Sequence, residues 1–271
     1  MHEHHSPDVS GEYLTGIVVV LVLAAVGAYL AAVWRLRARG DHWSWWPTAA
    51  AVSCGVLLIV AALAPLPGEP FATHMVQHLV VGMAAPLALV LARPITLALR
   101  ALGKPARARL LGVVRSRVVA VLMFPPVAAV LDIGGLWLLY RTGMFAAVHD
   151  RMGLHAVVFV HVFASGVLFS AAVTQLEPVR HRYSLLLRAA TLVAAAAGHA
   201  ILAKTLYASG PAGTSFAVGD VQLGAQIMYY GGDVVELALA AVLAGQWYLA
   251  TGRAQRHVLR RQQQWQSVTS H

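Results

Sequence analysis

Seven apolar stretches, each long enough to cross a bilayer as a helix, dominate this chain of 271 residues. A transmembrane helix needs about 20 consecutive apolar residues to cross a hydrocarbon core of about 30 Å. The composition agrees, because 59% of the residues are hydrophobic, only 11% are charged and the mean hydropathy is +0.67. The short alternating strands of a membrane barrel do not occur. The sequence therefore predicts an all-α, polytopic membrane protein with seven transmembrane helices in one bundle, at residues 13–34, 46–65, 72–99, 117–140, 153–174, 184–207 and 222–251.

Lysine and arginine gather on one side of these predicted spans, in segments 35–45, 100–117, 177–188 and 252–271. The opposite side offers only Arg141 and Arg151. Because basic loops stay in the cytoplasm, the N-terminus is predicted outside and the C-terminus inside. The chain then divides into a polar external tail (1–12), a seven-helix bundle (13–251) and a cytoplasmic basic tail (252–271), which we expect to be frayed.

Several classes of protein are disfavoured by simple counts. The net charge of +9 would suggest nucleic acid for a soluble protein, but here it reflects membrane topology, so no nucleic acid partner is predicted. The single cysteine, Cys54, excludes an internal disulfide framework and a Cys-pair metal site. The start MHEHHSPDVSGE lacks a basic region, so no cleaved signal peptide is expected. The sequence contains no nucleophile–base spacing, phosphate loop or HExxH motif, so an enzyme is not predicted.

Ionisable residues inside the predicted spans lie in their outer halves or near the middle. Such residues are costly in hydrocarbon and are candidates for function. They come from five spans and form one predicted layer open to the outside: His74, His78, Asp132, His155, His161, His199, Lys204, Asp233 and Glu236. Four prolines, at 86, 94, 125 and 126, are expected to kink the third and fourth spans.

His74 and His78 are four residues apart, so both imidazoles should project from one helix face. Imidazole suits copper, zinc or iron, and the thioether of Met83, which we assign loosely to the same face, favours Cu(I). Gln77 points to a neighbouring flank and is expected to hydrogen-bond between helices. Two structural alternatives stay open. A membrane histidine can simply hydrogen-bond an adjacent helix, and Asp132, Lys204 and Asp233 can form a structural ion-pair set.

Four segments together resemble the CtaG family of caa(3)-type cytochrome c oxidase assembly factors. The stretch HMVQHLVVGMAAPLALVLARP is similar to a family pattern of H-x-x-Q-H, then Pro, then Arg-Pro, which falls on His74, Gln77, His78, Pro86, Arg93 and Pro94. HVFASGVLF supplies His161, Gly166 and Phe169, and GHAILA supplies His199. DVQLGAQIMYYGGDVVEL is similar to the last motif at Asp220, Gln222, Gly224, Met228 and Asp233. The chain departs from the pattern at Ser170, Tyr229 and Asp233, where Trp, Trp and Glu are common.

The resemblance covers residues 65–250 and implies a multi-pass protein of the bacterial plasma membrane that delivers copper during oxidase maturation. It implies oxidase subunits as partners besides the lipid bilayer, and the choice between monomer and homo-oligomer stays open. Oxidase copper centres lie toward the outer face, where the polar layer is also predicted. We expect His74 and His78 to be primary Cu(I) ligands. His161 and His199 would complete the site, with Met83 and Met228 as weaker candidates. Gln77, Asp132, Asp233 and Glu236 would orient the imidazoles.

Two other functions remain in competition. His161 and His199, at similar depth on different spans, could be the axial ligands of a haem in a membrane electron carrier. Asp132, Lys204 and Asp233 could instead serve an ion or metal transporter or a proton relay.

Overall fold

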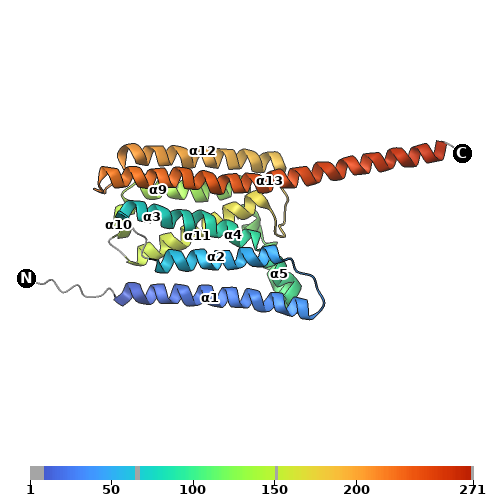
Figure 1. The fold of residues 1–271 in the computed structure, drawn as a ribbon, viewed down its shortest axis with the longest axis horizontal. Helices are drawn as coiled ribbons and strands as arrows, with labels where there is room; N and C mark the ends of the chain where they lie inside the picture. The colour runs from blue at the N-terminus through green and yellow to red at the C-terminus, as the bar shows by residue number, and fades with distance from the viewer. Residues whose placement is uncertain (1–8, 65–67, 150–151, 270–271) are drawn as a thin grey trace, which may run out of the picture.

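The computed structural model describes residues 9–64, 68–149 and 152–269, and this part of the chain is helical with no strand. Most of the helices run roughly parallel in one bundle (Figure 1). The elements are α1 (Val9–Ala38), α2 (Trp45–Leu63), α3 (Pro70–His78), the π-helical turn η1 (Leu79–Ala84), α4 (Ala85–Leu91), α5 (Pro94–Ala101), α6 (Lys104–Val114), α7 (Arg117–Leu122), α8 (Pro125–Ala129), the π-helical turn η2 (Val130–Gly134), α9 (Gly135–Arg141), α10 (Met144–His149), α11 (Met152–Thr174), α12 (Leu185–Ser209) and α13 (Val218–Thr269).

Six stretches of helix in the described residues are long and apolar enough to cross a membrane, at Tyr13–Ala38, Trp45–Leu63, Pro70–Ala101, Ala156–Thr174, Leu185–Ser209 and Val218–Gly252. The predicted span 117–140 is not among them. Its helix is broken after Leu122, because Pro125 and Pro126 cannot supply the backbone N–H groups that a continuing helix needs. The uninterrupted helical run from Pro125 to Arg141 would be about 25 Å long, somewhat less than a hydrocarbon core.

The two ends of the chain extend beyond their predicted spans. α1 begins at Val9, and the rest of the predicted external tail, 1–8, lies outside the described residues. α13 continues through Thr269 and projects from the bundle (Figure 1), so most of the tail that we expected to be frayed is helical.

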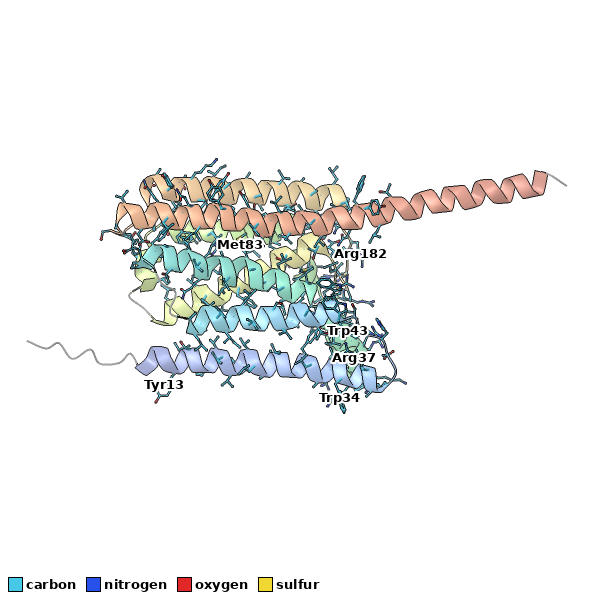
Figure 2. All side chains as sticks on the ribbon, in the orientation of Figure 1. Tyr13, Trp34, Arg37, Trp43, Met83 and Arg182 are labelled. Atoms are coloured by element: carbon cyan, nitrogen blue, oxygen red, sulfur yellow. The ribbon has the colours of Figure 1, made fainter. Side chains whose placement is uncertain are left out.

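The order of packing places α12 and α13 side by side at one edge of the bundle and α1 at the other edge, against α2 (Figure 1). Three apolar clusters hold the bundle together, one of them around Phe71, Met75, Tyr140, Leu202 and Met228. Figure 2 places Trp34, Arg37, Trp43 and Arg182 at one end of the bundle and Tyr13 at the other. Arg37 and Arg182, from two of the predicted basic segments, therefore share one end.

Two π-helical turns interrupt the helices that carry predicted site residues. η1 begins directly after His78, and η2 contains Asp132. Pro86 accounts for the first, because it has no N–H to donate to the carbonyl of Gly82 four residues earlier. π-helical turns are frequent at functional sites.

Candidate functional site

Two predicted histidines, one on α3 and one on α12, meet in the interior of the bundle. The centroids of the His78 and His199 rings are 6.3 Å apart, with an angle of 33° between the ring planes. The exposed fractions are 6% for His78 and 2% for His199, so both are withdrawn from the surrounding medium. The structure thus joins His199 to one member of the predicted His74/His78 pair.

His74 has a different environment although it lies on the same helix. Its Nε2 is 2.9 Å from the hydroxyl oxygen of Tyr140 on α9, and the imidazole tautomer decides which group donates. Its ring also meets the edge of Phe145 at a centroid distance of 4.9 Å. One nitrogen of His74 is therefore engaged by a neighbouring helix, the structural role that we kept open for a membrane histidine.

The Nε2 atoms of His78 and His199 are buried and have no hydrogen-bond partner within the described part of the chain. Buried polar groups normally form hydrogen bonds, because a buried donor or acceptor without one costs about 1–3 kcal/mol of stability. On the other side of the His199 ring, Nδ1 lies 3.4 Å from Oε1 of Glu236 on α13. A proton on Nδ1 would face this carboxylate and leave Nε2 as a free acceptor or ligand.

Glycines let the helices approach these rings. A Cβ on Gly232 would lie 2.6 Å from Nδ1 of His199, and one on Gly82 would lie 3.3 Å from Nδ1 of His78. Because real Cβ atoms essentially never come as close as 2.6 Å, residue 232 must be glycine if the His199 ring is to keep its position against α13.

A cavity of about 50 Å³ opens beside His78. It is lined by His74, Gln77 and His78 of α3, by Val81 of η1, by Tyr140 and Phe145, and by five further apolar residues of α9, α10 and α11. It has room for about three water molecules. His78 thus lies at the wall of a small, mostly apolar chamber.

Gln77 forms the expected interhelical hydrogen bond. Its side-chain nitrogen donates to the carbonyl of Ala61 on α2 at 3.5 Å.

Other predicted ligands lie elsewhere. His161 is exposed, and its Nε2 is 2.8 Å from the position that a Cβ on Gly135 would take. No ring contact or hydrogen bond joins His161 to another predicted histidine among the residues that the structure describes. Asp132 accepts a hydrogen bond from Oγ of Ser165 at 3.0 Å, so it is held by α11 rather than by an imidazole.

The two predicted methionines do not line the cavity. Met228 is fully buried in the apolar cluster with Phe71 and Met75, which is a packing role. Met83 lies in η1 and is half-buried (Figure 2). Nine α-helical residues from His74 are two and a half turns, so α-helical spacing alone would place Met83 on the opposite face.

The remaining charged residues do not form the ion-pair set that we kept open. Lys204 is exposed, with its Nζ 5.3 Å from the centroid of the Tyr229 ring, and it makes no salt bridge within the described ranges. Asp233 is half-buried and interacts electrostatically with His199 and Glu236. Across residues 9–64, 68–149 and 152–269, no three His, Cys, Asp or Glu side chains are grouped so that they could hold one metal ion. The geometry therefore offers a pair of histidines, not the expected set of four.

Sequence reasoning missed two residues that shape the site. Tyr140 ends the predicted fourth span and gave no signal of its own. Asp220 was noted only in the last motif, yet its carboxylate accepts from the backbone N–H groups of Phe71 and Ala72 at 2.9 and 2.8 Å. It thereby satisfies donors at the start of α3, the helix that carries His74 and His78. Glu177 caps the start of α5 in the same way, through Ile95 and Thr96.

The fold and this site define a multi-pass helical membrane protein with a pair of buried histidines, one of which lines a small, mostly apolar cavity. The model of the family described as cytochrome c oxidase caa3 assembly factor (Caa3_CtaG) matches residues 27–250, and the chain belongs to this family. The match includes all four motifs on which the resemblance was based.

Similar proteins occur in mycobacteria. The uncharacterized protein Mb0105 of Mycobacterium bovis is 31% identical over 170 residues, which is 58% of this chain and 25% of that protein. The uncharacterized protein ML1998 of Mycobacterium leprae is 28% identical over 182 residues, or 64% of this chain and 28% of its own length. The chain thus spans about a quarter of the curated relatives that it matches. No solved structure matches it.

Proposed function

We propose that the chain is a non-catalytic assembly factor that binds Cu(I) between Nε2 of His78 and Nε2 of His199 and supplies it to cytochrome c oxidase. The observation that carries the proposal is a pair of buried imidazole nitrogens, on α3 and α12, that have no hydrogen-bond partner among the residues that the structure describes. Membership of the oxidase assembly family supports the client. The copper is cargo, so a site with few ligands suits a protein that must also release the ion.

The spacing of the rings is compatible with one shared ion. With metal–nitrogen distances of about 2.0 Å, two imidazoles that face each other across a metal have centroids roughly 6 Å apart. The observed separation is 6.3 Å. Imidazole is a good ligand for copper, and a two-ligand site buried in the bundle favours the less highly charged Cu(I).

Glu236 and Tyr140 have separate roles in this proposal. Glu236, near Nδ1 of His199, keeps the other nitrogen free for the metal, as carboxylates do for many metal-bound histidines. Tyr140 holds His74 beside the chamber, where His74 and Gln77 line the route by which the ion reaches His78. His161, Asp132 and Met83 then lie outside the binding pair.

We also propose the topology and location of the protein. The N-terminus lies outside, the basic connections lie in the cytoplasm, and Pro125–Arg141 forms the seventh crossing of a bacterial plasma membrane. The sharing of one end by Arg37 and Arg182 supports this arrangement. A crossing of about 25 Å is shorter than the hydrocarbon core, so the bilayer must thin locally or neighbouring helices must shield the ends of the helix from lipid. Each ångström of such mismatch costs only a fraction of a kcal/mol.

The test is anaerobic loading of the purified protein with Cu(I), followed by metal analysis and titration against a chromogenic Cu(I) chelator. We expect one copper per chain in the wild type and in His42→Ala, whose histidine is exposed in a loop. His78→Ala and His199→Ala should each lower the affinity at least 100-fold, and His161→Ala should leave it unchanged. Equal copper in His78→Ala and the wild type would refute the pair, and loss in His161→Ala would restore the four-histidine site.

The client is tested in cells. A strain that lacks the protein should lose oxidase activity, and it should regain the activity with the wild-type gene but not with the His78→Ala variant. Full activity in the deletion strain would refute the assembly role even if the protein binds copper.

The haem alternative was predicted at His161 and His199, but His161 is exposed and the ring beside His199 is that of His78. The distance between His78 and His199 would also suit two axial ligands of a haem. However, the cavity beside His78 has a volume of about 50 Å³, far below the 300–1,000 Å³ usual for pockets that hold large ligands. A Soret band in the purified protein would reverse this conclusion.

A further inference from the structure

A long lateral groove lies between α1 and the rest of the bundle, away from the histidines. It is lined by residues of α1, α2, α4, α5 and α11 and has a volume of about 490 Å³. Its walls are apolar, with Tyr29 and Cys54 as the polar exceptions. The Tyr29 hydroxyl donates to the carbonyl of Ala92 at 2.7 Å, so it presents no free polar group to an occupant. The groove is therefore suited to hydrocarbon.

α1 is attached to the bundle loosely enough to leave this space. Only 11% of its apolar window is buried, against 50% for Pro70–Ala101. α1 lies close to α2 at Gly55, where an added Cβ would lie 2.6 Å from Cγ2 of Val26. Beside that contact, small residues such as Ala25, Ala28 and Ala51 leave the groove open.

The dimensions of the groove select its occupant. On α1 it extends from Leu21 to Ala32, a length of roughly 17 Å, so a volume of about 490 Å³ gives a mean cross-section of about 29 Å². A helix about 10 Å across has a cross-section of roughly 80 Å². The groove is thus narrower than a transmembrane helix of a partner, and an extended hydrocarbon chain fits along it.

Charge identifies the kind of lipid. One helical turn beyond the lining residues Ala32 and Leu97 stand Arg35 and Arg100, in the last turns of α1 and α5. Both are exposed, as is Arg37. Asp41, which lies 3.6 Å from Arg100, neutralises only one of these charges. A basic rim at the end of an apolar groove suits a lipid with an anionic headgroup.

We propose that this groove is a binding site for one acyl chain of an anionic glycerophospholipid from the bilayer, with its headgroup at Arg35 and Arg100. The lipid would fill the space between α1 and the bundle and join the two by contacts that the polypeptide lacks. This site is independent of the proposed copper function.

The test is native mass spectrometry of the purified full-length protein titrated with phosphatidylglycerol or phosphatidylcholine of identical chains. We expect the wild type to retain one phosphatidylglycerol at least fivefold more strongly than phosphatidylcholine. Ala25→Phe fills the middle of the groove and should abolish this retention. Ala31→Phe, on an exposed face of α1 outside the groove, is the matched control and should retain the lipid.

The rim is tested separately with the double substitution Arg35→Gln and Arg100→Gln, which should lower phosphatidylglycerol retention to the level of phosphatidylcholine. Equal retention by Ala25→Phe and Ala31→Phe, at equal apparent melting temperatures, would overturn the site. Equal retention of the two lipids by the wild type would also overturn the proposal, because the headgroup would then have no role. Loss of a co-purified polypeptide in Ala25→Phe without loss of lipid would overturn it in favour of a protein occupant.

Discussion

Gly166 on α11 offers the sharpest test of how closely the helices around the site must pack. A Cβ at this position would lie 3.0 Å from the carbonyl carbon of Gly82 and 3.0 Å from Cγ of Pro86, with the Gly82 carbonyl oxygen closer still. Carbon atoms at ordinary van der Waals contact are about 3.5–4.0 Å apart. In Gly166→Ala, α11 must therefore move away from η1 by at least about 0.5 Å along its whole contact.

The atoms in the way belong to the backbone and to a proline ring, so no side-chain rotation can relieve the overlap. Overpacking of this kind typically costs 1–3 kcal/mol, and we expect about 3 kcal/mol here because the obstacle is rigid. At 2–4 °C per kcal/mol for a chain of this size, the apparent melting temperature should fall by roughly 6–12 °C. Thermal unfolding in detergent, followed by circular dichroism, measures this change.

Gly27→Ala is the matched control, since it is also a helical glycine and an added Cβ there meets nothing within 4 Å. It should leave the melting temperature unchanged or raise it slightly, because alanine favours helix by about 1 kcal/mol over glycine. A melting temperature for Gly166→Ala within 2 °C of that for Gly27→Ala would refute the close crossing of α11 and η1.

Three further substitutions separate the residues that hold the site in place from those that we expect to bind copper. Asp220→Asn weakens the cap of α3 and should cost about 1–2 kcal/mol by thermal unfolding, whereas Glu69→Gln should have no effect because Glu69 caps α3 without a side-chain hydrogen bond. Glu236→Gln keeps the size of the side chain but removes its charge, and it should weaken Cu(I) binding about tenfold in a chelator competition assay. Tyr140→Phe leaves His74 without its hydroxyl partner and should lower stability by about 1–3 kcal/mol, while Cu(I) affinity stays within twofold of the wild type. A large loss of copper in Tyr140→Phe would return His74 to the set of ligands.

Periodicity and hydropathy predict the all-helical fold class because the length and apolarity of each run are enough to identify a membrane-spanning helix. Six of the expected runs are confirmed as helices long enough to span a membrane. The segment 117–140 was treated as equivalent, since hydropathy does not register that two adjacent prolines divide it. The effect of Pro125 and Pro126 was expected to be a kink, but the structure has a complete break that leaves the helix short.

The side chains that surround each histidine were harder to predict than the helices that carry them. The i, i+4 spacing correctly places His74 and His78 on one helix but says nothing about which partners approach from other helices. Tyr140 is 66 residues from His74 in sequence, and His199 still farther from His78. Which nitrogen is occupied and which is left free depends on these long-range contacts, so sequence treated two histidines with different environments as one pair.

The different environments also bear on whether the histidines serve packing or binding. A histidine that packs between helices satisfies its ring nitrogens with neighbours, and His74 approaches this condition through Tyr140. His78 and His199 do not, since each keeps a buried Nε2 that has no partner within the described part of the chain, at a combined cost of about 2–6 kcal/mol. An apolar side chain of similar size would avoid that cost. A bound ion that accepts the lone pairs of both nitrogens at once would also avoid it. A soft cation held between the two rings provides such compensation, which is why the copper proposal depends on this pair and not on the number of histidines in the membrane.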